Sequence, residues 1–267
     1  MLDAGEGMRL ERFGSRVVVR PHPAAFGERR TPSAWSDASL TYEPGRGWSG
    51  PDTGDPWQIG MDGLTVELRQ TETGQVGLFP EQQDPWAWLR NRVAQDMAVL
   101  NLFGYTGLAT LVAASEGASV VHVDASRPTV AWARHNAELS GLGGRPVRWI
   151  VDDAAAFVAR ELRRGHRYDG VVLDPPSYGH GPRGPGWRLE DDLAPLLHQV
   201  AELVDAPMGF VLLTAHTPNF GPEQLADVLA APFGVTRARI DRGALQVTAR
   251  TGTSLELGAF ARWPGAR

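Results

Sequence analysis

The sequence predicts a doubly wound α/β fold, in which a mostly parallel sheet carries helices on both faces, preceded by a β-rich N-terminal region. Three observations support this prediction. Short apolar strands alternate with segments of helix length from Val99 to Ala230. The carboxyl ends of those strands carry glycines and carboxylates. Residues 1–85 lack this alternation and are rich in turn residues.

Composition restricts the class of protein. The 267 residues are 42% hydrophobic, which suffices for one large α/β domain or one domain with a smaller appendage. No apolar stretch approaches the roughly 18 residues of a membrane span, and the first residues do not resemble a signal peptide, so we expect a soluble, cytoplasmic protein without membrane partners. Cysteine is absent and all 26 cationic side chains are arginine, which excludes thiolate metal sites, cysteine nucleophiles and lysine bases. We expect no metal, and the sequence leaves monomer and homodimer open.

We assign residues 1–85 to an N-terminal β-rich region. A strand is predicted at Arg16–Arg20, and a hairpin at Gly63–Phe79 with its turn at Thr73-Gly74. Residues 21–57 follow no period of 2 or 3.6 and are predicted to form a long irregular loop. The loop is expected to pack onto the protein because it contains three tryptophans, Trp35, Trp48 and Trp57.

We assign residues 86–267 to the α/β domain. A helix over Asp84–Asp96, with Asp84 as N-cap, is predicted to lead into it. Residues 234–263 alternate without a helical crossover and predict two or three strands, at least one of them antiparallel. The predicted strands are Val99–Leu102, Val120–Val123, Val147–Val151, Gly170–Leu173 and Met208–Thr214, and the predicted helices are Leu108–Glu116, Pro128–Ser140, Ala154–Arg164, Leu189–Val204 and Pro222–Ala230.

The first strand runs into "NLFGYTG", residues 101–107, which opens directly into a helix. Gly104 and Gly107 allow a sharp turn and a close approach of a ligand to the backbone. A dinucleotide fingerprint requires three glycines, so two glycines with Tyr105 between them suit a smaller group than a pyrophosphate. A plain glycine turn is the alternative.

The next two strands end in carboxylates. Asp124 stands where a ribose diol is bound in doubly wound sheets, and the alternative is a cap on the helix that begins near Pro128. Asp152 and Asp153 stand where an adenine ring would pass, with Asp153 as a helix N-cap as the alternative.

The fourth strand ends in "DPPSY", residues 174–178. Two prolines remove two backbone donors and fix the chain, so the turn presents the Asp174 carboxylate and a backbone carbonyl without competing donors. Two neighbouring acceptors suit an amino group or a ring N–H, and a planar base could stack on Tyr178. The alternative is that the turn only terminates the strand.

Taken together, these strand ends resemble the class I S-adenosylmethionine-dependent methyltransferases. The resemblance is greatest to the branch of bacterial large-subunit rRNA methyltransferases, through N-x-F-x-Y-T-G at 101–107 and D-P-P at 174–176, and it covers Leu64 to Thr214. It implies a seven-stranded Rossmann-like sheet and S-adenosyl-L-methionine as cofactor. By this resemblance Glu81 and Gln82 approach the methionine end of the cofactor, with a surface role for Glu81 as the alternative. The implied cofactor-binding residues are Glu81, Gln82, Asn101, Phe103, Gly104, Tyr105, Thr106, Gly107, Asp124, Ala125, Ser126, Asp152, Asp153, Ala154 and Asp174, and the implied catalytic residues are Asp174, Pro175, Ser177 and Tyr178.

The resemblance implies methyl transfer, and residue content narrows the acceptor. Methylation of cytosine carbon 5 requires a cysteine, and ribose 2′-O-methylation commonly relies on lysine, so nitrogen of an rRNA base fits best. The net charge of −5 keeps open a small-molecule or protein acceptor, because nucleic-acid binders usually carry a basic surplus. A nucleotide-binding Rossmann protein without methyl transfer is the third alternative. Residues 179–188, with His180, Arg183 and Arg188, are expected to form a lid or a solvated loop, and His216 is a candidate lining residue.

Overall fold

The structure, a computed structural model, describes residues 1–179, 186–205, 209–218 and 220–265. It divides into two compact units. The first unit comprises Met1–Glu81 and Gln246–Leu257, and the second comprises Gln82–Leu245 and Gly258–Arg267. The predicted boundary near residue 85 assigned the whole C-terminal hairpin to the α/β domain, whereas the structure includes the tip of that hairpin in the first unit.

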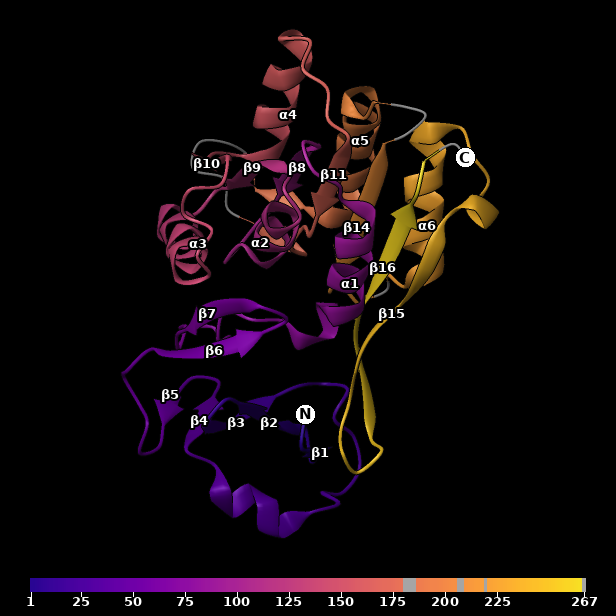
Figure 1. Ribbon diagram of the computed structural model, residues 1–267. Helices are drawn as coiled ribbons and strands as arrows, with labels where there is room; N and C mark the ends of the chain where they lie inside the picture. The colour runs from indigo at the N-terminus through magenta and orange to yellow at the C-terminus, as the bar shows by residue number, and fades with distance from the viewer. Residues whose placement is uncertain (180–185, 206–208, 219, 266–267) are drawn as a thin grey trace. The chain divides into compact units, whose positions relative to one another are not determined.

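The second unit contains a seven-stranded sheet with the order β10-β9-β8-β11-β14-β16-β15, and Figure 1 shows these strands side by side. All neighbouring pairs from β10 to β14 are parallel, and β16 runs antiparallel to β14. This confirms the predicted doubly wound, mostly parallel sheet. The strands are β8 (Ala98–Leu102), β9 (Ser119–Asp124), β10 (Val147–Val151), β11 (Gly170–Leu173), β14 (Phe210–Ala215), β15 (Asp241–Thr248) and β16 (Ser254–Trp263), with a separate two-residue pair, β12 (Tyr178–Gly179) and β13 (Trp187–Arg188).

Helices pack against one another in two series, α1 with α2 with α3 and α4 with α5 with α6. The α4–α6 series shares one apolar core with Leu100, Val121 and Leu173, which point to that face of the sheet. Their sequence neighbours point to the opposite face, as the two-residue period of a strand requires. The helices are α1 (Gln83–Arg92), α2 (Leu108–Ser115), α3 (Arg127–Leu139), α4 (Ala154–Arg163), α5 (Leu189–Leu203) and α6 (Pro222–Ala230), with 3-10 turns η3 (Ala231–Phe233) and η4 (Arg237–Arg239).

The first unit contains a five-stranded sheet of order β1-β2-β3-β4-β5 and a β6-β7 hairpin. Two predictions for this region were wrong. The segment 21–57 is not a single irregular loop, because it contains a 3-10 helix and two strands. Leu64–Leu68 is a strand, but it pairs with Trp57–Met61 through the Asp62-Gly63 turn. The elements are β1 (Asp3–Gly5), β2 (Met8–Phe13), β3 (Arg16–Pro21), η1 (Pro32–Asp37), β4 (Leu40–Glu43), β5 (Gly47–Ser49), β6 (Trp57–Met61), β7 (Leu64–Leu68) and η2 (Pro80–Gln82).

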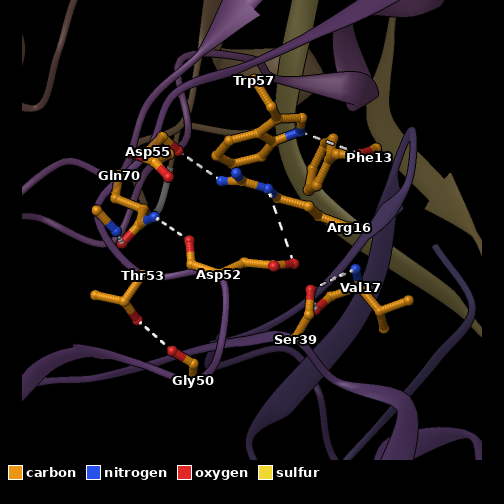
Figure 2. Close-up of polar contacts among 11 residues, drawn as sticks. Phe13, Arg16, Val17, Ser39, Gly50, Asp52, Thr53, Asp55, Trp57 and Gln70 are labelled. Atoms are coloured by element: carbon orange, nitrogen blue, oxygen red, sulfur yellow. Dashed lines mark hydrogen bonds and ion pairs between the residues drawn. The ribbon is translucent and has the colours of Figure 1, made fainter.

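The three tryptophans of the 21–57 segment are anchored as expected. The indole N–H of Trp35 donates to Asp3 Oδ2 at 3.0 Å, that of Trp48 to the Thr71 carbonyl at 2.7 Å, and that of Trp57 to the Phe13 carbonyl at 3.1 Å. Figure 2 shows the last of these contacts, with the Arg16 guanidinium over the Trp57 ring and donating to the Asp55 carbonyl at 2.6 Å. Buried or half-buried indoles with satisfied N–H groups explain why this polar segment packs onto the unit.

Candidate active site

Four strand ends lie next to one another at the carboxyl edge of the seven-stranded sheet. Leu102 pairs with Val123 on one side and with Leu173 on the other, and Val151 pairs with Asp124. The sheet order reverses between β8 and β11, so this edge contains the switch point at which doubly wound sheets bind ligands. The residues predicted from the separate strand ends are therefore brought to one edge.

The turn after β8, residues 103–107, is the turn to which the sequence resemblance assigns the cofactor, and it is named the cofactor loop on that expectation. Phe103 and Tyr105 have φ of 57° and 47°, and Gly107 has φ of 91°. Two non-glycine residues in the left-handed region store backbone strain, which is typical of binding sites. Gly107 is the N-cap of α2 and offers no side chain as a capping acceptor, so the first N–H groups of the helix are available to a ligand.

Asp124 binds the cofactor loop from the end of β9. Its Oδ2 accepts the Tyr105 backbone N–H and its Oδ1 accepts the Ser126 backbone N–H, both at 2.9 Å. Burial raises the pKa of Asp124, and these two hydrogen bonds oppose the rise in part. The N-cap of α3 is Ser126, whose hydroxyl accepts from Thr129, so capping α3 is not the role of Asp124.

The acidic pair after β10 is engaged locally. Asp153 Oδ1 accepts the Ala156 N–H at 2.9 Å as the N-cap of α4, which is the structural alternative considered for it. Asp152 forms an ion pair with Arg160 and accepts the Asp153 N–H at 2.9 Å. Ala154 is buried in the first turn of α4. Of the carboxylates at the ends of β9 and β10, that of Asp124 is therefore the one that holds the cofactor loop.

Asp174 is held on both carboxylate oxygens. The Thr214 hydroxyl at the end of β14 donates to Oδ1 at 2.6 Å, and Gln82 Nε2 donates to Oδ2 at 2.7 Å. His216 Nε2 lies 3.8 Å from Oδ1 and 3.4 Å from Gln82 Nε2. The carboxylate therefore has a defined orientation at the switch point, with further lone pairs for a ligand. Gln82 and His216 were candidates from the sequence, whereas Thr214 carried no signal beyond ending a strand.

The rest of the D-P-P-S-Y turn is fixed from β13. The Trp187 indole N–H donates to the Pro176 carbonyl at 2.8 Å, and the same ring lies 4.9 Å from the Phe103 ring, centroid to centroid. Trp187 thus connects the turn with the cofactor loop, a role that the sequence did not reveal. Pro175 is buried, while Tyr178 is 70% exposed.

Several other candidates face the interior or lie elsewhere. The Asn101 amide donates to Thr110 Oγ1 at 2.9 Å inside the sheet, and Thr106 is buried with its carbonyl accepting from Asn136. Ser177 Oγ bonds Thr217 Oγ1 at 2.7 Å, and Ala125 is exposed. Glu81 is buried at the end of the first unit, and Gln82 begins the second.

His180 and Arg183 lie outside the described residues. Arg188 is described, and it forms an ion pair with Asp191 at 3.3 Å. In the described ranges, no group of three or more His, Cys, Asp or Glu side chains could hold a metal ion. Nor does that part of the chain contain a helix with the length and apolar character to cross a membrane.

The edge fits a nucleoside better than a pyrophosphate. The cofactor loop presents strained backbone, a free helix start and the Asp124 carboxylate, which are partners for hydroxyl and carboxylate groups. Beside it, the Asp174 turn presents acceptors for hydrogens on nitrogen. The arrangement can bind one molecule at the loop and position a second at the turn.

Comparisons with known proteins agree with this geometry. A family profile described as S-adenosylmethionine-dependent methyltransferase matches residues 41–235. The crystal structure of an S-adenosylmethionine-dependent methyltransferase from Agrobacterium tumefaciens superposes with a TM-score of 0.91 and 35% identity, covering 98% of this chain and 89% of that one.

Two curated relatives are rRNA large-subunit methyltransferases. Methyltransferase K/L of Methylococcus capsulatus is 33% identical over 58% of this chain and 21% of its own length. Methyltransferase I of Pseudoalteromonas translucida is 31% identical over 67% of this chain and 45% of its own length. The chain therefore spans less than half the length of these relatives.

Proposed function

Because the chain belongs to the S-adenosylmethionine-dependent methyltransferase family, we propose that it transfers a methyl group to a nitrogen of an rRNA base. The names of the curated relatives support an rRNA acceptor. The single observation that carries the nitrogen acceptor is the fixed Asp174 carboxylate at the switch point, next to the cofactor loop in the sheet.

The cofactor supplies an electrophilic methyl group on a positively charged sulfonium. We assign its binding to the backbone of the cofactor loop, the free start of α2 and the Asp124 carboxylate, which would accept from ribose hydroxyls. The carboxylates of Asp152 and Asp153 are less open to the cofactor, because Arg160 and the first turn of α4 engage them. Gln82 stands beside Asp174 and holds its carboxylate through the hydrogen bond to Oδ2.

The D-P-P-S-Y turn would hold the acceptor. The Pro176 carbonyl already accepts a hydrogen bond from Trp187. We therefore assign the binding of the acceptor nitrogen to the Pro175 carbonyl and to the remaining lone pairs of Asp174. Two such acceptors orient a nitrogen that carries hydrogens and stabilise the positive charge it develops, so positioning and electrostatics dominate catalysis. The exposed Tyr178 ring offers a face on which a planar base can stack.

Residue content supports nitrogen over other rRNA atoms. The sequence has no cysteine to add to a pyrimidine ring, and it has no lysine for the chemistry that commonly activates a ribose hydroxyl. The turn itself requires neither group, because an amino nitrogen attacks with its own lone pair.

Labelled methyl transfer tests the proposal. The full chain would be incubated with S-adenosylmethionine labelled in the methyl group and with RNA, protein and metabolite fractions from a strain that lacks the gene. We expect label in large-subunit rRNA, on a base nitrogen after nuclease digestion and mass analysis. Label in the metabolite or protein fraction, or on a carbon or ribose oxygen, would overturn the acceptor assignment.

A further inference from the structure

A buried polar row lies in the sheet beneath the cofactor loop. His122 on β9 is the centre of the row and is fully buried. It pairs in register with Asn101 on β8 and with Trp149 on β10, and its ring lies 5.0 Å from the Trp149 ring. Thr110 of α2 joins the row, so the row lies on the face of the sheet that this helix covers.

The hydrogen bonding of His122 is incomplete. Nδ1 and Thr110 Oγ1 are 2.9 Å apart, and the same hydroxyl accepts from the Asn101 amide at 2.9 Å. Nε2 has no hydrogen-bond partner among the described residues. A buried nitrogen without a partner destabilises a fold. This indicates that the ring is present for its shape and position.

The ring lies directly against Gly104. A Cβ on residue 104 would lie 2.4 Å from His122 Cε1 and 2.5 Å from Nδ1, which is too close for atoms that are not bonded to each other. Gly104 does not have a positive φ, so its backbone conformation is open to alanine. Gly107 differs, because its φ of 91° by itself favours glycine and a Cβ there would meet Ala133 and Leu111.

We infer that His122 is a positioning residue for the cofactor loop, and that its imidazole is the surface that fixes the position of Gly104. The loop is thereby held from below by the ring and from the side by Asp124, which accepts the Tyr105 N–H. These two contacts explain how the backbone of Phe103 and Tyr105 remains in the strained left-handed region. The inference rests on the cofactor site of the proposed function.

The test is a double-mutant cycle on Gly104→Ala and His122→Ala, with the affinity for S-adenosylhomocysteine measured by calorimetry. Gly104→Ala should weaken binding at least about tenfold, as overpacking does. In the double variant, removal of the ring should restore most of that loss. Gly107→Ala is the matched control, and His122→Ala should not rescue it.

A second control separates the ring from its nitrogens. His122→Phe keeps a ring at this place and should leave the Gly104→Ala defect in full. The inference would be overturned if Gly104→Ala lowered the affinity for S-adenosylhomocysteine equally in the presence and absence of the His122 ring. It would also be overturned if His122→Ala restored the affinity of Gly107→Ala as much as that of Gly104→Ala.

Melting temperatures distinguish this outcome from failure of the proposed function. If the wild-type chain binds no S-adenosylhomocysteine, the cofactor assignment fails, while coupling between residues 104 and 122 can still be read in the melting temperatures of the four proteins. Additive melting temperatures would then refute the contact as well.

Discussion

Asp124 does not have the capping role that the sequence presented as the alternative to ribose binding. It does not cap α3, since Ser126 does, but it binds the cofactor loop through the Tyr105 N–H. A carboxylate with two backbone donors still has lone pairs for a ribose hydroxyl. Loss of this side chain should therefore affect both the shape of the loop and a direct contact.

We predict that Asp124→Ala weakens S-adenosylhomocysteine binding by ~1.5–3 kcal/mol, roughly ten- to a hundredfold, as for lost charge-assisted hydrogen bonds. Calorimetry on the folded variant measures this. Glu138→Ala removes an exposed carboxylate on α3 and serves as the control with unchanged affinity. An unchanged affinity in Asp124→Ala would show that this strand end is not part of the cofactor site.

Asp174 should separate binding from turnover. We predict that Asp174→Ala leaves S-adenosylhomocysteine affinity within about twofold but abolishes methyl transfer, because the acceptor loses its oriented partner. Single-turnover transfer to the labelled fraction measures the chemical step. Glu202→Ala, an exposed carboxylate on α5, is the control. Retained transfer in Asp174→Ala would remove the turn from catalysis.

His122 should make the fold acid-sensitive. Burial lowers the pKa of His122 to about 3, so the folded chain stays unprotonated there while the unfolded chain gains a proton below about pH 6.5. The unfolded state then binds more protons between about pH 6.5 and 3, and stability falls as pH falls through that window. Between about pH 7.5 and 5 this group should remove ~2 kcal/mol.

Denaturant unfolding of the wild type and His122→Phe at both pH values measures this effect. The variant should show a smaller acid loss by that amount, because it lacks the titrating ring. Equal acid losses in the two proteins would mean that His122 is protonated in the folded state.

At the scale of elements, the β6-β7 hairpin shows which turn signal decides pairing. Asp62 and Gly63 have φ of 49° and 80°, the pair of left-handed residues that a two-residue type I′ hairpin turn needs. The Thr73-Gly74 turn exists, with the Gly74 N–H donating to the Thr71 carbonyl at 3.1 Å, but it does not join two strands. Asp62-Gly63 was therefore a stronger signal for a hairpin turn than Thr73-Gly74.

Gly63→Ala should destabilise the first unit by ~1–2 kcal/mol, because alanine is strained at positive φ. Gly60→Ala is the matched control in the same hairpin, since Gly60 has no positive φ and open space around its Cα. Denaturant unfolding compares the two variants. A Gly60→Ala loss equal to that of Gly63→Ala would exclude the turn as the cause.

At the scale of the whole molecule, the net charge of −5 opposes a polyanionic substrate. An RNA acceptor must then be held by few phosphate contacts and by stacking on groups such as Tyr178. With about two phosphate contacts on a single strand, raising salt from about 50 to 200 mM should lower kcat/KM for RNA by roughly sevenfold. The affinity for S-adenosylhomocysteine should change little in the same salt series. Transfer that is independent of salt would indicate an uncharged acceptor.

Local signals predicted the second unit well. Strands β10 and β11 and helix α6 match their predicted bounds, because short stretches rich in β-branched residues and a proline at the start of a helix are short-range signals. The family match also favours a methyltransferase over the third alternative, a nucleotide-binding Rossmann protein without methyl transfer. The N-terminal strands were largely missed, since β4 and β5 have only three or four residues and β4 also depends on pairing with the distant strand β3.

The sequence by itself determined which residues end the strands, and hence that glycines, Asp124 and Asp174 meet at one edge of a parallel sheet. Only the tertiary structure decided what each side chain touches: that Asn101 turns inward to Thr110, that Thr214 holds Asp174, that Trp187 binds the Pro176 carbonyl, and that His122 lies against Gly104. The physical reason is range. Strand ends and caps follow from neighbours within a few residues, whereas a hydrogen bond between Asp174 and Gln82, 92 positions apart, exists only once the chain has packed.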